Sequence, residues 1–376
     1  MRPEEVWMAR AISLARQGWG STHPNPLVGA VIIENGEIVA EGFHPAAGQP
    51  HAERQALKNL GRRPAPHSTM AVTLEPCSTH GRTPPCVDGI IEAGISRVLI
   101  GAEDPNPLHQ GRGVTLLRQA GIEVETGVLE ADCQDLNLIF NHRMSTGRPL
   151  VAAKLALTLD GKTATRTGRS KWITGALARQ NVMLWRQYFP AIGVGAGTAQ
   201  ADDPALTARL PAPQPKVLCG RRFVFDRRLL LADKPLQYQV FNDHWSSQTV
   251  LVCDQTSPSQ TVDQLHHAGI TVWQLEGENP SQRWAHFLEL LLKAELNGIY
   301  IEGGAGLLSG LFGIQAIDYL FVYRGSQILF DMEALSPADT GPLLDLSKAA
   351  RLSEIRRESF GADDLVRGHL IPGQAE

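Results

Sequence analysis

The chain has 376 residues, of which 43% are hydrophobic and 20% are charged, and this ordinary globular balance predicts two domains at roughly 150 residues each. The net charge of −4 excludes a bulk electrostatic attraction to nucleic acid or an acidic membrane, but it leaves room for a local basic pocket that binds a phosphate. No apolar run approaches the ~20 residues that a membrane span needs, and we expect no signal segment, because the N-terminus runs straight into a helix pattern.

The number and spacing of the cysteines indicate in which cellular compartment the protein resides. The chain has five cysteines, an odd and sparse set at positions 77, 86, 133, 219 and 253. Disulfide frameworks are typical of small secreted domains, whereas cytosolic proteins keep their thiols reduced. We therefore expect reduced cysteines and a cytoplasmic protein.

The first part of the chain alternates strand patterns with helix patterns. The pair Asn35-Gly36 predicts a hairpin between strands at 27–33 and 37–43, since Asn-Gly between apolar runs is the strongest short hairpin signal. The other elements predicted here are helices at 3–18, 51–60, 86–93, 114–120 and 130–144, and strands at 70–74, 97–101 and 122–126. This spacing predicts α/β layering, with helices covering a mixed sheet.

The segment 145–149 breaks this pattern, and we place a domain boundary there, which gives domains 1–146 and 147–376. The second domain is predicted to be α/β as well. Its predicted strands are 150–156, 191–194, 217–225, 249–252, 271–275, 299–302 and 321–323, and its predicted helices are 176–189, 262–267, 284–297 and one from about 307. We expect loops at 195–203, at the proline-containing 204–215 and at 331–342, and the pattern weakens from Arg324 onward.

A metal site is indicated by His51, Cys77 and Cys86. One imidazole and two thiolates suit Zn²⁺, and three protein ligands leave the fourth position open for water, as in catalytic zinc sites. Cys77 at a strand end and Cys86 at a helix start can converge on His51 in an α/β fold. Glu53 lies two residues from the histidine, placed to carry protons for that water. The order H-x-E, P-C and a second Cys is typical of zinc-dependent base deaminases, in which a zinc-bound hydroxide attacks a ring carbon carrying an amine.

Two other interpretations of these residues stay open. A closed structural zinc would need a fourth ligand, which His80 or Cys133 could supply. The protein would then be a binding or regulatory protein and not an enzyme. We expect His23, His44, His67 and His109 to be surface or hydrogen-bonded histidines and not ligands.

A second site is indicated by the strand at 299–302, which runs into Gly303-Gly304-Ala305-Gly306 and then a helix. Such glycines let the backbone approach a phosphate, and a helix N-terminus supplies N–H donors. A tight turn with no ligand explains the same pattern equally well. The run from Gly193 to Gly197 has the wrong spacing for a dinucleotide fingerprint, and we expect a loop after it.

These residues resemble the bifunctional deaminase/reductase family of riboflavin biosynthesis. The resemblance covers residues 1 to about 325, and the eight-residue gap between Cys77 and Cys86 is specific to it among deaminases. The segments that carry the resemblance are 22–29, 51–53, 74–86, 104–107, 143–147, 159–161, 172–174 and 201–207.

The resemblance implies a cytidine-deaminase-like α/β/α domain followed by a dihydrofolate-reductase-like α/β domain. The first would hydrolytically remove the 2-amino group of 2,5-diamino-6-(5-phosphoribosylamino)pyrimidin-4(3H)-one. The second would use NADPH to reduce the ribosyl group of the product to ribityl. By motif match the zinc ligands are His51, Cys77 and Cys86, and Glu53 is the catalytic proton carrier. Thr79 stands where the family usually has His.

The resemblance also assigns residues of the reductase site. The implied cofactor-binding residues are Ala156, Trp172, Thr198, Asp202, Arg227, Gly304, Ala305, Gly306, Leu307, Leu308, Ser309 and Gly310. The implied substrate-binding residues are Ser170, Arg186, Leu206, Arg209 and Glu302. Arg186 and Arg209 carry planar forks suited to a phosphate, and Lys154 is placed to hold the opening sugar. Trp172 would equally suit a core position.

We therefore expect a cytoplasmic bifunctional enzyme with one zinc ion, with NADPH as its second cofactor and a small phosphoribosylated pyrimidine as its substrate. We expect a homo-oligomer, with a dimer contact through the reductase domain, and neither a nucleic acid nor a membrane partner. The rival enzyme is a nucleobase or nucleoside deaminase joined to an unrelated or inactive second domain. Arg186, Arg209 and the glycine turn count against it, since a nucleoside needs no phosphate clamp.

Overall fold

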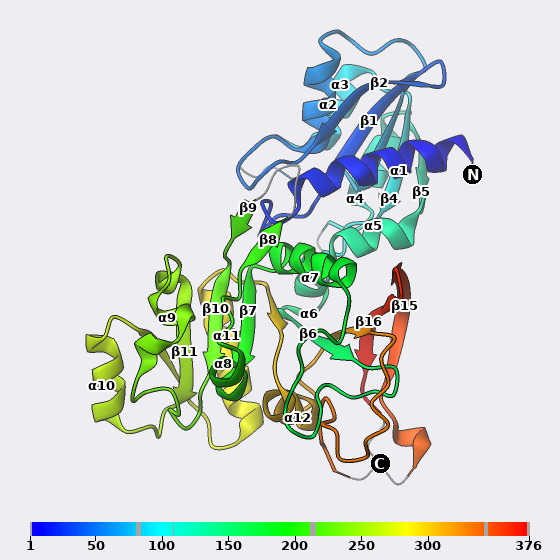
Figure 1. Ribbon diagram of the computed structural model, residues 1–376. Helices are drawn as coiled ribbons and strands as arrows, with labels where there is room; N and C mark the ends of the chain where they lie inside the picture. Colours follow the sequence, from blue (N-terminus) through cyan, green and yellow to red (C-terminus); the bar gives the residue numbers. More distant parts are fainter. Residues whose placement is uncertain (1, 80–83, 108, 211–215, 342–344, 374–376) are drawn as a thin grey trace. The chain divides into compact units, whose positions relative to one another are not determined.

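The computed structural model describes residues 2–79, 84–107, 109–210, 216–341 and 345–373. The chain forms two compact units, Met1–Arg148 and Pro149–Glu376 (Figure 1). The division between them lies inside the segment 145–149, where the sequence pattern breaks. Among the described residues, no helix combines the length and the apolar character required to cross a membrane.

The first unit begins with a helix and then alternates strands with helices. Its elements are α1 (Pro3–Ala15), η1 (Arg16–Gly18), β1 (Gly29–Glu34), β2 (Glu37–Phe43), α2 (Ala52–Leu60), β3 (Thr69–Leu74), α3 (Cys86–Ala93), β4 (Arg97–Ala102), α4 (Arg112–Gln119), β5 (Glu123–Thr126), α5 (Glu130–Leu136) and α6 (Leu138–Thr146).

Among the described residues, the five strands of this unit form one sheet in the order β2-β1-β3-β4-β5. Strand β1 is antiparallel to β2 and β3, whereas β3, β4 and β5 are parallel, so the predicted mixed sheet is confirmed. Helices α2, α3 and α4 pack on one face, where Ala56, Ile90 and Leu117 join strand residues in a buried apolar cluster. Helices α1 and α5 contact the strands as well as each other, which completes three layers.

The predicted continuous helix at 130–144 is wrong, because the chain breaks at Asn137 between α5 and α6. The Asn137 side chain accepts a hydrogen bond from the Leu27 N–H at 2.7 Å and donates one to the Leu27 carbonyl at 3.0 Å. Asn137 is buried, and this side-chain pairing satisfies backbone groups that a loop would otherwise leave open. The break therefore ties the segment that follows Asn25 to the helical layer.

The second unit continues the alternation and ends in a hairpin. Its elements are β6 (Leu150–Leu157), α7 (Ala176–Tyr188), β7 (Ala191–Gly195), α8 (Ala196–Asp202), β8 (Ala208–Leu210), β9 (Lys216–Leu218), β10 (Arg221–Phe225), η2 (Pro235–Gln237), α9 (Gln239–Asn242), η3 (Ser246–Gln248), β11 (Thr249–Asp254), α10 (Ser259–His267), β12 (Thr271–Leu275), α11 (Pro280–Lys293), β13 (Gly298–Ile301), α12 (Ala305–Gly313), β14 (Tyr319–Arg324), η4 (Leu346–Lys348), β15 (Arg351–Phe360) and β16 (Asp363–Ile371).

Among the described residues, nine of these strands form one sheet in the order β12-β11-β10-β7-β13-β6-β14-β16-β15. The strands from β12 to β14 run parallel, and the β15–β16 hairpin adds antiparallel strands at the edge beside β14. One face carries α11 and α12, with Phe287 and Leu308 in its apolar cluster. The other face carries a second cluster that includes Ala199, Val240 and Leu265. In such sheets, ligands bind at the carboxyl ends of the parallel strands.

Three predictions for this unit are wrong. The expected loop at 195–203 contains helix α8, since Ala196, Ala199 and its other alanines favour a helix strongly enough to outweigh the glycines. The predicted strand at 217–225 is divided between β9 and β10, because Gly220 lies against the Pro190 carbonyl, where a side chain would clash. The expected loop at 204–215 contains the short strand β8, and residues 211–215 lie outside the described residues.

The strands β15 and β16 were not predicted at all. The burial pattern of β15 is exposed or intermediate along its whole length, and its sequence carries several charged side chains. An edge strand of this kind lacks the apolar alternation by which strands are recognised. Its pairing with β16, and the pairing of β16 with β14, holds it in place.

Candidate functional site

The predicted zinc ligands lie together in the first unit. The ligand atoms of His51, Cys77 and Cys86 lie within 4.8 Å of one another, and no other such group of His, Cys, Asp and Glu side chains occurs among the described residues. His51 Nδ1 lies 3.6 Å from Cys77 Sγ and 3.3 Å from Cys86 Sγ. One imidazole nitrogen and two thiolates are a donor set that zinc prefers. The residues present therefore fit a zinc ion.

Helix starts and a strand end bring these ligands together. His51 is the N-cap of α2, Cys77 follows the buried strand β3, and Cys86 is the first residue of α3. Helix α2 approaches β2 closely at Gly42, where a Cβ atom would lie 2.4 Å from the Ala52 carbonyl oxygen. The Cys86 N–H also donates to Cys77 Sγ at 3.3 Å. Two helix N-termini thus face the site, and their dipoles favour thiolates.

The electrostatics of the cysteine pair favour a negative charge at the site. A hydrogen bond from the Cys86 thiol, with help from His51, lowers the pKa of Cys77 to about 4. The same hydrogen bond and burial raise the pKa of Cys86. A thiolate is therefore present at neutral pH to receive a cation.

Glu53 lies in the first turn of α2 and is only 3% exposed. Burial, together with the nearby Cys77, raises the pKa of its carboxyl group. A carboxyl group with a raised pKa can both accept and return a proton near neutral pH. The side chain is placed beside the ligands without belonging to the ligand group.

Sequence reasoning missed the roles of Asn25 and His44. The ring of His44 packs edge-on against His51, with centroids 5.5 Å apart, and is buried. His44 Nδ1 donates to the Pro50 carbonyl at 3.1 Å, which leaves Nε2 as the acceptor for the Asn25 amide at 3.1 Å. His44 is thus hydrogen-bonded, as predicted, and it also packs against the predicted ligand His51. The only indication of these roles in the sequence was that Asn25 lies inside the segment 22–29, which carries part of the resemblance.

Glu75 organises the loop that follows β4. This buried carboxylate accepts hydrogen bonds from the backbone N–H groups of Asp104 at 3.1 Å, Gly111 at 3.0 Å and Val114 at 3.2 Å. It connects the segment leading to Cys77 with the segment 104–107 that carries part of the resemblance. Glu75 is therefore a structural support for the rim of the site.

Of the two residues considered as a fourth zinc ligand, the structure describes only Cys133. Cys133 is buried in α5, where its thiol faces the Val128 carbonyl at 3.9 Å, and it does not belong to the ligand group. His80 lies outside the described residues. His23, His67 and His109 also lie outside the ligand group, as predicted.

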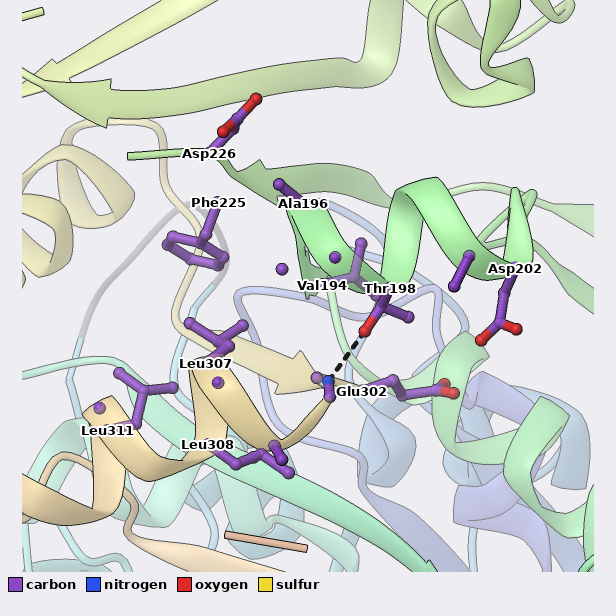
Figure 2. Close-up of a pocket in the computed structure, with 18 of the residues that line it drawn as sticks. Val194, Ala196, Thr198, Asp202, Phe225, Asp226, Glu302, Leu307, Leu308 and Leu311 are labelled. Atoms are coloured by element: carbon purple, nitrogen blue, oxygen red, sulfur yellow. Dashed lines mark hydrogen bonds between the residues drawn. The ribbon is translucent and has the colours of Figure 1, made fainter. Parts of the chain in front are cut away.

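The second unit holds a cavity of about 1080 Å³ at the carboxyl ends of the parallel strands (Figure 2). It is lined from the ends of β6, β7, β10 and β13, the place where α/β sheets bind ligands. The predicted residues that line it are Ala156, Ser170, Arg186, Thr198, Asp202, Leu206, Arg227, Glu302, Gly304, Ala305, Gly306, Leu307, Leu308 and Gly310. Lys154, Phe225 and Asp226 line it too.

The glycine turn forms one wall of this cavity. Gly304 is the N-cap of α12, which starts at Ala305, slightly earlier than predicted. The Gly304 N–H donates to Thr198 Oγ1 at 2.9 Å, drawn as the dashed line in Figure 2. A Cβ atom at Gly306 would have no atom within 4 Å, so the cavity is open there. The first N–H groups of a helix have no partner within the helix and can bind a phosphate, so this wall fits a dinucleotide.

Arg186 and Glu302, whose side chains are 12% and 11% exposed, form an ion pair beside the glycine turn. Arg186 Nε and Nη2 donate to the two carboxylate oxygens of Glu302 at 2.6 and 2.9 Å, and Nη1 donates to the Thr207 carbonyl at 2.9 Å. Burial by itself would raise the pKa of Glu302, but the Arg186 charge holds it below its usual value. The fork of Arg186 is thus engaged by Glu302.

Three predicted residues of the reductase site do not line the cavity. Trp172 is 67% exposed, which also excludes the core position considered for it, and Arg179 stacks over its ring at 4.3 Å. Ser309 Oγ accepts the Asp339 N–H at 2.8 Å. Arg209 Nη1 donates to Thr207 Oγ1 at 3.3 Å, next to the lining residue Leu206.

Lys154 lies deeper in the cavity wall on strand β6. Burial lowers the pKa of its ammonium group, whereas the nearby carboxylates of Glu302 and Asp202 oppose that change. The amine of Lys154, the Arg186–Glu302 ion pair and the N-terminus of α12 therefore all line the same cavity.

Two family models match the chain. The first describes a cytidine and deoxycytidylate deaminase zinc-binding region and matches residues 1–102. The second describes a RibD C-terminal domain and matches residues 149–360. Each match falls on one of the two compact units.

Whole-chain relatives agree with the family models. The chain is 39% identical to riboflavin biosynthesis protein RibD of Actinobacillus pleuropneumoniae, over 96% of this chain and 93% of that protein. It is 42% identical to RibD of Bacillus amyloliquefaciens, over 85% of this chain and 84% of that protein. A solved structure from Thermotoga maritima, a diaminohydroxyphosphoribosylaminopyrimidine deaminase/5-amino-6-(5-phosphoribosylamino)uracil reductase, is 35% identical, with a TM-score of 0.79 over 98% of this chain and 99% of that chain.

Proposed function

The chain belongs to the RibD family of riboflavin biosynthesis proteins, and on that premise we propose how its residues carry out two successive reactions. The protein is a bifunctional deaminase/reductase that uses Zn²⁺ and NADPH. It hydrolyses the 2-amino group of 2,5-diamino-6-(5-phosphoribosylamino)pyrimidin-4(3H)-one and then reduces the ribosyl group of the product to ribityl. The observation that carries this conclusion is the pairing of a His-Cys-Cys cluster in one unit with a glycine-walled cavity in the other.

In the first reaction, His51, Cys77 and Cys86 would hold the zinc ion, which supplies a Lewis acid that lowers the pKa of water to about 7. Glu53 takes the proton of the attacking water and passes it to the departing amine nitrogen. The carbon–nitrogen bond breaks, a carbon–oxygen bond forms, and ammonia leaves. His44 keeps the His51 ring in place through their edge-on contact.

In the second reaction, Gly304, Gly306 and the N-terminus of α12 would hold NADPH, which would supply a hydride for C1′ of the ribose. Glu302, held ionised by Arg186, is placed to bind sugar hydroxyls. Lys154 holds the sugar while the bond between C1′ and the ring oxygen breaks, and the released ring oxygen takes a proton from solvent. Arg209 binds the phosphate of the substrate.

Removal of the metal tests the first half of this scheme. Dialysis against a zinc chelator is expected to abolish ammonia release, and added Zn²⁺ is expected to restore it. The same treated protein should still oxidise NADPH when supplied with the deaminated intermediate, because the cavity lies in the other unit. Full ammonia release from metal-free protein would contradict the assignment of His51, Cys77 and Cys86.

We also propose that the protein is a cytoplasmic homodimer joined through the reductase unit. The cysteines are free thiols, as a reducing compartment would keep them. The side chains of Ile328, Phe330 and Met332, which lie in one segment without regular secondary structure, are 42%, 87% and 94% exposed, which is unusual for large apolar side chains outside an interface. Light scattering should give a dimer mass for the native chain and a monomer mass for Phe330→Glu. A native monomer would refute the dimer.

A further inference from the structure

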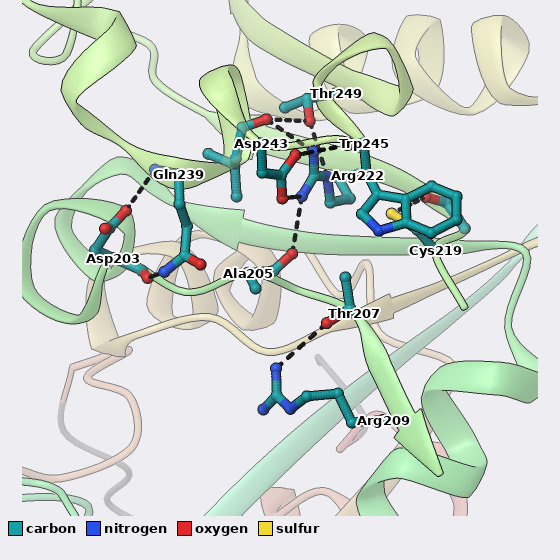
Figure 3. Close-up of polar contacts among 12 residues, drawn as sticks. Asp203, Ala205, Thr207, Arg209, Cys219, Arg222, Gln239, Asp243, Trp245 and Thr249 are labelled. Carbon is teal, nitrogen blue, oxygen red and sulfur yellow. Dashed lines mark hydrogen bonds and ion pairs between the residues drawn. The ribbon is translucent and has the colours of Figure 1, made fainter. Parts of the chain in front are cut away.

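A fully buried arginine lies on β10, a strand whose carboxyl end lines the reductase cavity. Arg222, on β10, has a side chain that is 0% exposed (Figure 3). Nη1 and Nη2 donate to the two carboxylate oxygens of Asp243 at 2.7 and 2.8 Å. Nε donates to Thr249 Oγ1 at 2.8 Å. Figure 3 shows these side chains converging from separate elements.

Backbone carbonyls take the remaining hydrogen bonds. Nη2 donates to the Val240 carbonyl at 2.8 Å, and Nη1 donates to the Ala205 carbonyl at 2.9 Å. A guanidinium has five N–H groups in a fixed planar arrangement, so all five have acceptors here. The Ala205 carbonyl is therefore held at one distance and angle relative to β10.

Ala205 belongs to the segment 203–207, which borders the substrate end of the cavity. The next residue, Leu206, lines the cavity, and the Thr207 carbonyl accepts the hydrogen bond from Arg186. Arg186 in turn holds Glu302. One unbroken series of contacts thus runs from Arg222 through the backbone of this segment to the ion pair in the cavity wall.

The segment 203–207 has a conformation that needs support. Asp203 and Leu206 have positive φ angles of 40° and 53°, which residues other than glycine rarely adopt. Such conformations persist where the surroundings over-determine them. Asp203 is held at one end by Gln239, whose N–H donates to Asp203 Oδ1 at 2.8 Å, and Arg222 holds the middle at Ala205.

Stability alone does not account for this arrangement. Replacing a buried ion pair by apolar side chains of similar size is often neutral or stabilising, because two charges no longer have to be desolvated. The surroundings are apolar, since Leu206, Val224 and Val240 belong to one core cluster. An apolar pair at positions 222 and 243 would fill the space but could not hold the Ala205 carbonyl.

We propose that Arg222, oriented by Asp243, is a positioning residue for the reductase reaction. It sets the backbone of residues 203–207 so that Leu206, Arg186 and Glu302 meet the ribosyl end of the deaminated intermediate. This inference rests on the proposed function, which assigns that end of the cavity to the substrate. The role concerns substrate binding and not the binding of NADPH at Gly304 and α12.

The test uses the full chain carrying Arg222→Met and Asp243→Leu together. We expect the KM for the deaminated intermediate to rise roughly tenfold to hundredfold, as misplacement of a binding group by about 1 Å does. The NADPH dissociation constant, the zinc content and ammonia release should stay within twofold of the native values. The matched control is Leu291→Ala, which weakens the core of the same unit at a buried α11 residue that does not line the cavity.

An unchanged KM in the double variant overturns the proposal. It is also overturned if KM, kcat and NADPH affinity all shift together as in Leu291→Ala, since that would be the behaviour of general destabilisation. If the double variant does not fold, Thr249→Val removes the partner of Arg222 Nε, together with the hydrogen bond from Thr249 Oγ1 to the Val240 carbonyl, and leaves the Arg222–Asp243 ion pair in place. It should raise KM in the same direction by a smaller factor, and an unchanged KM in this variant counts against the proposal.

A third variant separates this inference from the function on which it rests. Glu302→Gln alters the ion pair in the cavity directly. If Glu302→Gln leaves the KM for the intermediate unchanged, the assignment of this end of the cavity to the substrate fails. If Glu302→Gln raises KM while the Arg222/Asp243 double variant does not, only the positioning role fails.

Discussion

The replacement Glu53→Gln separates proton transfer from metal binding in the deaminase unit. The change keeps the size of a side chain that is only 3% exposed, but it removes the group that exchanges protons. Positioned acid–base groups contribute about 10²–10⁴-fold to rates, so the loss corresponds to roughly 3–5 kcal/mol of barrier. Zinc content should stay at the native value, because Glu53 lies outside the ligand group.

The assay follows ammonia release at saturating substrate, together with zinc content on the same samples. Glu92→Gln is the matched control, since Glu92 is an exposed residue of the same unit on α3. It should keep native activity. The account of Glu53 is refuted if Glu53→Gln retains more than about a tenth of native turnover, given the expected range. Loss of zinc from this variant would instead make Glu53 a support of the metal site.

Other predictions concern the reductase unit. Arg186→Met leaves the Glu302 carboxylate, only 11% exposed, without its partner, so urea unfolding should show up to about 3–5 kcal/mol less stability, and NADPH oxidation should fall while ammonia release is unchanged. Because Arg186 holds the pKa of Glu302 below its usual value, the stability from this pair is complete above the unfolded-state pKa of about 4.3 and is lost as pH falls through the lower folded-state pKa. Glu302→Gln should reduce this loss of stability at low pH. An acid-unfolding curve identical to that of the native chain would contradict the prediction. Gly306→Asp puts a negative charge where the cofactor phosphates would bind, in open space and at a helix start that tolerates it. Titration should show NADPH binding weakened at least about tenfold, or about 1.4 kcal/mol, with native unfolding.

The deaminase half was predictable because the residues of its metal site lie in short segments of the sequence. His51 and Glu53 lie on one helix start, and Cys77 and Cys86 follow and begin regular elements. Each pattern is local, and few metals or reactions suit that set of residue types. The contact of His44 with His51 was not predictable, since it depends on how a loop folds back beside α2.

The reductase half was harder to predict because its decisive contacts are long-range. Gly304 and the start of α12 follow a local strand–turn–helix pattern, which the sequence carries. Arg186 and Glu302 are 116 positions apart, and neither has a local signal that names the other as its partner. Arg222 was only part of a predicted strand, and a buried arginine there contradicts the apolar pattern by which strands are recognised.

The secondary-structure errors have different causes. The sequence predicts a loop where helix α8 forms, because Gly195 and Gly197 favour a helix less than the alanines beside them do. Strand β15 was missed because an exposed edge strand needs no apolar alternation. Local helix propensity decides the structure of α8, whereas strand pairing decides that of β15.

The central claim is that one chain performs both reactions in order, and a coupled assay on the phosphoribosylated diaminopyrimidinone tests it most directly. Zinc-loaded protein should release ammonia in the absence of NADPH, and NADPH added afterwards should then be oxidised in step with formation of the ribityl product. Ammonia release without later NADPH oxidation would remove the reductase half of the account. No ammonia release from zinc-loaded protein would contradict the account as a whole.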